Sequence, residues 1–206
     1  MSLSASVAVL IDLSSELELT GDLSAALRRA EEAEAAARAA ADTEGLAAAR
    51  IAVARVRYRL GHYEAAKSLA AEVLASAPSR SPVRADAWQV LGNCAADTDA
   101  LALAAAHYRT AADLARETGN HRAQVAALQG LAGGAYYPRG QFDLAMAAAN
   151  EVFRIAAAQS RPDWLVYPQT VLCMIYEATA QDRKARTALD ELARLAAPGA
   201  LAYGCG

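Results

Sequence analysis

The sequence predicts an all-α fold in which short helix pairs are stacked into an α-solenoid. The first observation is composition, since 56 of the 206 residues are alanine. Alanine is the best helix former and a poor strand former. The second observation is a turn pattern that returns about every 40 residues. The chain is therefore long enough for about five units of two helices each, or about ten helices.

The repeat is visible in five segments: LTGDLSAAL, RLGHYEAAK, ADTDALALAA, PRGQFDLAM and TAQDRKART. Their turn position holds Gly21, Gly61, Asp99, Gly140 and Ala180, which follow one another at nearly constant spacing. An alanine follows five places later in every segment, as Ala26, Ala66, Ala104, Ala145 and Ala185. With alanine at about a quarter of the chain, five matches by chance have odds of about one in a thousand, so the register is credible.

Each unit reads as two antiparallel helices joined by that turn. Before the turn, apolar residues recur at helical spacing, as at Trp88, Leu91 and Ala95, and a second such helix follows it. Proline near a helix start and glycine near a helix end should separate the units. The predicted units are 5–45, 46–83, 84–120, 121–161 and 162–199, and residues 200–206 are either the truncated start of a further helix or a disordered tail.

The connections between units carry their own signals. Pro82 and Pro162 are expected in first helical turns, where a missing N–H costs nothing. Gly45 and Gly119 permit the left-handed backbone that ends many helices, and Asn120 is a plausible N-cap. Inside the units, small residues let the two helices approach, namely Ser14, Ala54, Gly92, Gly133 and Cys173. A lone hairpin of this kind cannot bury its apolar face, so the units must stack.

Charge and cysteine usage exclude several classes of protein. Twenty basic against 23 acidic residues disfavours direct nucleic-acid binding, which normally needs a basic face. The sequence contains no apolar run long enough to span a membrane, and no secretory signal is recognisable. Three cysteines, far apart and without C-x-x-C spacing, indicate a reducing compartment. A cytoplasmic protein is expected, with no membrane contact.

The chain resembles the tetratricopeptide repeat (TPR) family over nearly its whole length. The third unit carries the W-x-x-L-G signature as Trp88, Leu91 and Gly92, followed by Ala104 and Tyr108. The second unit has Gly61, Tyr63, Ala66 and Pro78, and the fourth has Gly133, Tyr136, Gly140, Phe142 and Ala145. The resemblance implies a right-handed superhelical solenoid whose inner, concave groove binds a partner.

In TPR proteins the groove is formed by the first helix of each unit, so the resemblance also implies which residues line it. The corresponding polar and aromatic positions are suited to hydrogen bonding and stacking with a protein, a peptide or a small effector. They are Arg55, Tyr58, Arg59, Asp86, Gln89, Asn93, Tyr137, Tyr167, Thr170, Met174 and Glu177. The Lys and Asn clamp of chaperone-tail-binding TPRs is not reproduced, because only Asn93 matches; Arg55 and Arg59 could instead hold another anion.

The repeat is longer than the TPR average, with a period of about 40 residues against the common 34. In this it resembles the sensor region of maltose-regulator-type (LuxR/STAND-like) bacterial transcription regulators. That resemblance implies a non-catalytic sensor segment of a larger regulator. The alternative is a stand-alone scaffold or adaptor for assembling protein complexes. The length of the native reading frame would separate the two. An uncapped end of the solenoid could also pair copies into a homo-oligomer.

Chemistry at a catalytic or metal site is not expected. The three histidines, His62, His107 and His121, lack a metal-binding spacing such as H-E-x-x-H. No candidate nucleophile has an adjacent base, and no phosphate-binding loop is present. We therefore expect no enzyme activity, no metal and no cofactor.

Overall fold

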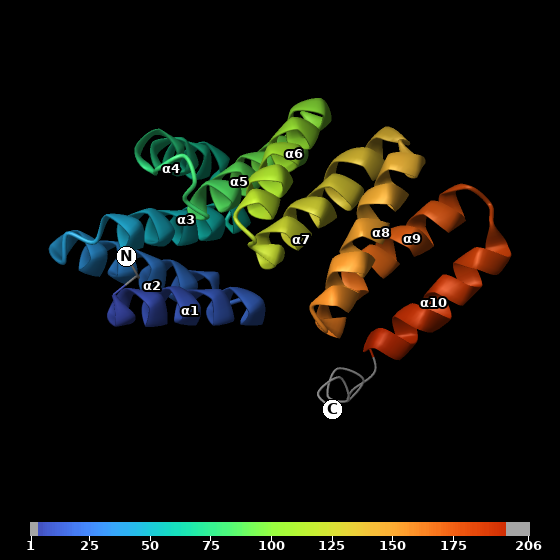
Figure 1. The fold of residues 1–206 in the computed structure, drawn as a ribbon, viewed down its shortest axis with the longest axis horizontal. Helices are drawn as coiled ribbons and strands as arrows, with labels where there is room; N and C mark the ends of the chain where they lie inside the picture. The colour runs from blue at the N-terminus through green and yellow to red at the C-terminus, as the bar shows by residue number, and fades with distance from the viewer. Residues whose placement is uncertain (1–3, 197–206) are drawn as a thin grey trace.

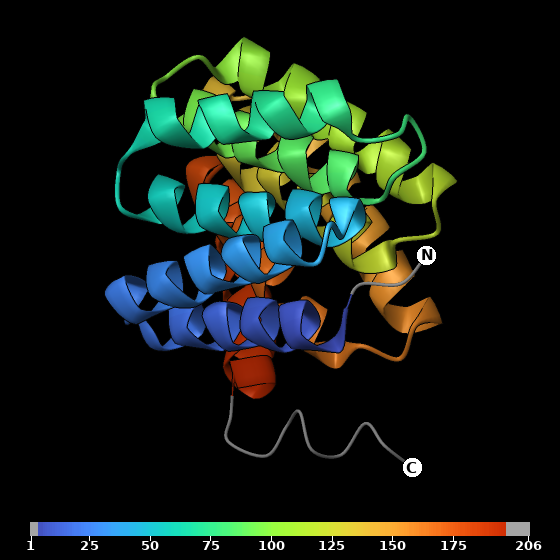
Figure 2. The same cartoon turned by 90° about the vertical axis from the view of Figure 1, so that its left-hand side faces the viewer.

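The computed structural model describes residues 4–196 and is built from α-helices, which confirms the predicted fold class. Ten α-helices follow one another along an arch, with the first pair and the last helix lying toward the same side of it (Figure 1). A second view shows how closely the first helices are stacked (Figure 2). The helices are α1 (Ala5–Thr20), α2 (Leu23–Ala39), α3 (Thr43–Arg59), α4 (Tyr63–Ser76), α5 (Val83–Asp97), α6 (Leu101–Glu117), α7 (His121–Gln129), α8 (Phe142–Ala158), α9 (Val166–Ala178) and α10 (Asp182–Ala196).

All five predicted turn residues have left-handed backbone. The values of φ are 86° at Gly21, 79° at Gly61, 60° at Asp99, 66° at Gly140 and 52° at Ala180. The repeat register therefore located left-handed positions even where the residue is not glycine. Each of these residues ends the first helix of a pair and allows the second helix to fold back against it.

Three connections between pairs use the same geometry, with left-handed residues at Ala41, Gly119 and Ser160. Seven of the left-handed turns also close a backbone hydrogen bond from the residue after the left-handed one to a carbonyl five places earlier, as from the His62 N–H to the Arg57 carbonyl. The connection from α4 to α5 differs, because the Arg84 guanidinium donates to the Leu74 and Ala77 carbonyls and satisfies the end of α4.

The prediction for Gly45 is wrong. Gly45 lies within the first turn of α3 and is buried, and the left-handed residue of this connection is Ala41. Asp42 caps α3 by accepting a hydrogen bond from the Gly45 N–H, and a Cβ on Gly45 would collide with the Asp42 carboxylate. Hydrogen bonds from the Gly45 and Ser4 N–H groups lower the pKa of Asp42. The N-cap prediction at Asn120 is confirmed, since its Oδ1 accepts from the Ala123 N–H at 3.1 Å.

The core is built on small residues at the helix crossings. The alanines five places after each turn are buried, four of them with no exposed surface. On the facing helices, Ser14 and Ala54 are also fully buried, and the Ser14 Oγ donates to the Ala26 carbonyl. Close approach of the two helices of a pair follows from these short side chains.

A large side chain is accommodated in the middle of the solenoid. Tyr108 of α6 is 3% exposed and lies against Gly92, Gly130 and Gly134, and a Cβ on Gly92 would come within 2.6 Å of the ring. Burial raises the pKa of Tyr108. Beyond Gln129 the first helix of the fourth pair continues as a π-helix, η1 (Gly130–Tyr136), and a 3₁₀ turn, η2 (Tyr137–Arg139).

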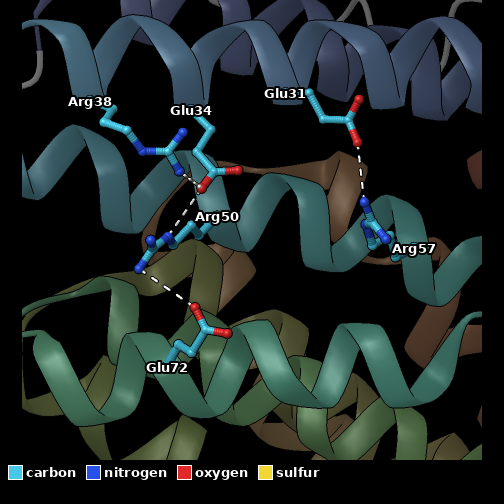
Figure 3. A network of polar contacts seen from close by, with 6 residues as sticks. All are labelled: Glu31, Glu34, Arg38, Arg50, Arg57 and Glu72. Atoms are coloured by element: carbon cyan, nitrogen blue, oxygen red, sulfur yellow. Dashed lines mark hydrogen bonds and ion pairs between the residues drawn. The ribbon is translucent and has the colours of Figure 1, made fainter.

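The first two pairs are joined by ion pairs between helices (Figure 3). Arg50 on α3 contacts Glu34 of α2 at 3.2 Å and Glu72 of α4 at 3.7 Å, and Arg57 of α3 contacts Glu31 of α2 at 3.2 Å. Arg38 adds a contact to Glu34 within α2. These charges connect α2, α3 and α4 from one helix to the next.

Candidate binding pocket

A pocket of about 300 Å³ lies on the first helices of the first four pairs. Its walls come from α1, α3, α5 and α7 and from the residue that caps α7. No second helix of a pair takes part, so this is the surface on which a groove was predicted. The lining residues are Ser15, Glu18, Leu19, Arg55, Arg59, Asp86, Gln89, Asn120, Arg122, Ala123 and Ala126.

Arg55 is held by the first pair of helices. Its guanidinium donates to Glu18 at 2.6 Å and to the Ser15 hydroxyl at 2.9 Å. Glu18 is only 8% exposed, so its carboxylate depends on this partner. The interaction joins α3 to α1 in the wall of the pocket. The positive charge of Arg55 is therefore neutralised by a residue of the protein itself.

Arg59 and Arg122 are exposed and form no ion pair with any residue of the described range 4–196. They enter the pocket from different helices, α3 and α7. An arginine can bind a carboxylate or a phosphate through two parallel hydrogen bonds, and two arginines on a rigid frame can approach one anion from two sides.

Asp86 supplies a half-buried carboxylate to the same pocket. Burial raises its pKa, and the charges of Arg55 and Arg122 act in the opposite direction. Gln89 lies next to it in the lining and offers both a donor and an acceptor. The pocket therefore combines two arginines with a carboxylate and an amide that can each accept a hydrogen bond from an N–H.

Four of the eleven predicted groove residues meet in this pocket: Arg55, Arg59, Asp86 and Gln89. Asn93 is engaged elsewhere, since its Oδ1 accepts a hydrogen bond from the Tyr108 hydroxyl at 2.8 Å. Tyr58 is half-buried with its ring 6.0 Å from that of Tyr63. Burial and the charge of Asp97 raise the pKa of Tyr58.

The other predicted residues lie in the fourth and fifth pairs, outside the pocket. Tyr137 packs against Phe142, with 5.7 Å between the ring centroids. Tyr167 is 44% exposed, and the Thr170 hydroxyl donates to the Val166 carbonyl of its own helix. Met174 is half-buried and Glu177 is exposed on α9. Ligand binding by any of the eleven residues remains a prediction.

Two charged residues of the pocket were not predicted from the sequence. Glu18 stands three places before its turn, where Tyr58 and Tyr137 stand in their units, so the register itself could have found it. Arg122 lies at the beginning of α7, far from the turn at Gly140, and no residue at that place was considered in the other units. Its position in the pocket follows only from the packing of the helices, which places α7 in the same lining as α3.

Within the described part of the chain, no group of three or more His, Cys, Asp or Glu side chains is placed to hold a metal ion. Cys94 and Cys173 are buried free thiols, and burial raises the pKa of both. Across residues 4–196, no helix is sufficiently long and apolar to span a bilayer. The segment 200–206, predicted as a further helix or a tail, and Cys205 lie outside the described residues.

Comparison with known proteins gives a result for the fold only. No family model matches the sequence, and no curated protein matches it either. Two similar solved structures are crystal structures of nearly identical TPR-like repeats from a Podosopora anserina protein assigned as a kinesin light chain, one of them with a single substitution. The substituted form gives a TM-score of 0.65 at 20% identity and covers 92% of this chain and 93% of its own. The other gives 0.63 at 20% identity and covers 92% and 94%. The chain therefore has the fold of a TPR-like repeat solenoid.

Proposed function

We propose that this protein is a non-catalytic interaction module that binds an acidic segment of a partner protein in the pocket formed by α1, α3, α5 and α7. The observation that carries the proposal is the pair Arg59 and Arg122, which lines the pocket without an ion-pair partner in the described residues, whereas Arg55 is neutralised by Glu18. A TPR-like solenoid is suited to this role because its packed helices fix the backbone positions from which both arginines reach the pocket.

The size of the pocket favours a side chain or a chain end over a large compact ligand. About 300 Å³ is at the lower end of the range for small-molecule pockets, at about 300–1,000 Å³. An extended peptide could place one carboxylate between the arginines and continue along the first helices. Its backbone N–H groups could donate to Asp86 or Gln89. A small acidic effector is the alternative that the same residues could bind.

The setting of the module is proposed from the repeat length. Turn residues that recur about every 40 residues resemble those of the sensor regions of maltose-regulator-type transcription regulators. In such a setting, a bound partner or effector would bias the curvature of the solenoid in the cytoplasm and report to other modules. A stand-alone scaffold is the second setting, and the native reading frame distinguishes them by the presence or absence of flanking phosphate-loop and helix-turn-helix segments.

The pocket can be tested with a fluorescein-labelled hexaglutamate peptide measured by anisotropy against a hexaglutamine peptide of equal length. We expect the acidic peptide to bind and its affinity to fall as salt is raised. Arg59→Ala and Arg122→Ala should each weaken binding by about tenfold, since a hydrogen bond to a charged group is worth about 1.5–3 kcal/mol before solvent screening.

Arg109→Ala is the matched control, because Arg109 is an exposed arginine on α6 and does not line the pocket. It should bind like the unaltered protein. Equal binding of the acidic and neutral peptides, or equal loss in all three arginine variants, would contradict the assignment of the pocket. Circular dichroism of each variant verifies that helicity is retained.

A further inference from the structure

The two ends of the solenoid can be compared with its internal interfaces, because the repeat register assigns every residue a place relative to its turn. Four places on each first helix face the preceding pair, and we call them the head face. In α3, whose turn residue is Gly61, they are Ala49, Ala52, Val53 and Val56, none more than 2% exposed. All residues at the same places in α5, the α7–η1 segment and α9 are apolar.

The head face of α1 departs from this pattern. It holds Val9, Asp12, Leu13 and Glu16, with Val9 56% and Leu13 46% exposed, and both carboxylates are exposed as well. Asp12 stands where Ala52 is buried in the next pair, and Glu16 stands where Val56 is buried. This end of the solenoid therefore combines an apolar pair with two negative charges.

The opposite end shows the complementary change. Two places on each second helix face the following pair, and we call them the tail face. In α2, whose turn residue is Gly21, they are Ala30 and Ala33, and in the first four pairs every tail-face residue is at most 3% exposed. In α10 the same places hold Leu189, which is 45% exposed, and the half-buried Leu192.

A positive charge accompanies this tail face. Six places after its turn residue Gly21, α2 has Leu27, which packs in one cluster with Ala52 and Val53 of α3. The same place in α10 holds Arg186, which is exposed and forms no ion pair within residues 4–196. A helix docked on α10 in the register of the internal interfaces would bring its Ala52-equivalent residue next to Arg186.

We infer that a second copy of this chain docks head to tail, with the head face of its α1 on the tail face of α10. Asp12 of one copy then lies beside Arg186 of the other, and Val9 and Leu13 cover Leu189 and Leu192. The internal interfaces supply the geometry and the opposite charges supply the pairing. Because the two surfaces differ, the contact is heterologous, and each copy can bind one further copy at each end. This association is independent of the proposed peptide pocket.

Sedimentation velocity of the full chain over a range of concentrations tests the contact. We expect the weight-average sedimentation coefficient to rise with concentration, and the rise to diminish with salt. Asp12→Arg and Arg186→Asp should each weaken association by about tenfold, because a charge reversal turns an attraction into a repulsion. An equimolar mixture of the two variants should recover association, since each variant then meets an opposite charge.

Glu117→Arg is the matched control, a charge reversal at an exposed residue of α6 away from both ends, and it should associate like the unaltered chain. A chain that sediments as a monomer at every concentration overturns the inference, as does a mixture that fails to recover association. A chain lacking residues 197–206 is measured in the same way as a further test. If it associates while the full chain does not, the tail face is covered by the chain's own last segment and the inference is wrong.

Discussion

The first two helix pairs and the last three are held together by different interactions. In the first two, arginines reach from one helix to another, as Arg50 does to Glu34 and Glu72 and Arg55 does to Glu18. From α5 onward, the ion pairs in the described residues join near neighbours in the chain, as Arg154 and Glu151 do. There, aromatic rings against glycine add to the aliphatic contacts between helices, with Tyr108 as the main example.

The difference shows that one backbone repeat can be stabilised by two kinds of chemistry. Both regions share the turn geometry and the buried alanine after each turn. In the first two pairs, arginine and glutamate side chains connect neighbouring helices, and their stems can pack beside the short side chains of the core. Where glycine leaves room between helices because it has no side chain, a tyrosine ring fills the space. Mutations should therefore affect the two regions differently.

The largest effect is expected from Tyr108→Ala in the second region. Removing a buried ring from a space bounded by three glycines should lower the free energy of unfolding by about 3–5 kcal/mol, measured by urea denaturation. Tyr108→Phe removes only the hydrogen bond to Asn93 and should cost about 0.5–1.5 kcal/mol. If the two variants were equally damaging, the hydrogen bond would be the main contribution of Tyr108 and the contrast between regions would weaken.

Substitution of the buried alanines tests the close helix packing that both regions share. Ala26→Leu and Ala104→Leu should each lower the free energy of unfolding by about 1–3 kcal/mol, because both side chains lie at a close helix crossing with no exposed surface. Ala102→Leu, at an exposed place on α6, is the control and should be close to neutral. Tolerance of leucine at Ala26 alone would mean that the first region is more loosely packed than the second.

Ion pairs between helices should contribute more than those within a helix. Arg55→Ala leaves the buried Glu18 carboxylate without its partner and should cost about 1–3 kcal/mol. Arg154→Ala removes a solvent-exposed pair within α8 and should change the free energy of unfolding much less, because water and salt screen the two charges. Urea denaturation at low and high salt distinguishes them, and equal losses in the two variants would contradict the difference between regions.

The smallest effect concerns the pocket where the regions meet. Asp86 has a folded-state pKa above the usual 3.8, so its contribution to stability is full at pH below that value and is lost as the pH rises through the folded-state pKa. Asp86→Asn should therefore raise Tm slightly at neutral pH and give no gain in acid. The same variant should bind hexaglutamate more tightly, since a negative charge leaves the pocket. A fall in Tm at neutral pH would contradict this prediction.

The helix pairs were predicted well from the sequence because their register depends on local chemistry. The alignment of the repeats alone placed turns at Asp99 and Ala180, and both residues have left-handed backbone. The hydrogen-bond partners of the predicted groove residues did not follow from the sequence, since Arg55 is bound by Glu18 and Asn93 by Tyr108, both on other helices. Arg55 was expected to bind an anion, whereas in the structure its guanidinium pairs with the buried Glu18 carboxylate. Such partners depend on packing between units, which periodicity does not encode.

The left-handed turns have a consequence for how such a chain can grow. Turns inside a pair and turns between pairs share one geometry, and they recur about every 20 residues except across the connection from α4 to α5. The elementary module is therefore a single helix with its turn, about half the length of the pair. Gene duplication could lengthen the arch by one helix at a time, and an odd number of helices would be as well connected as an even one.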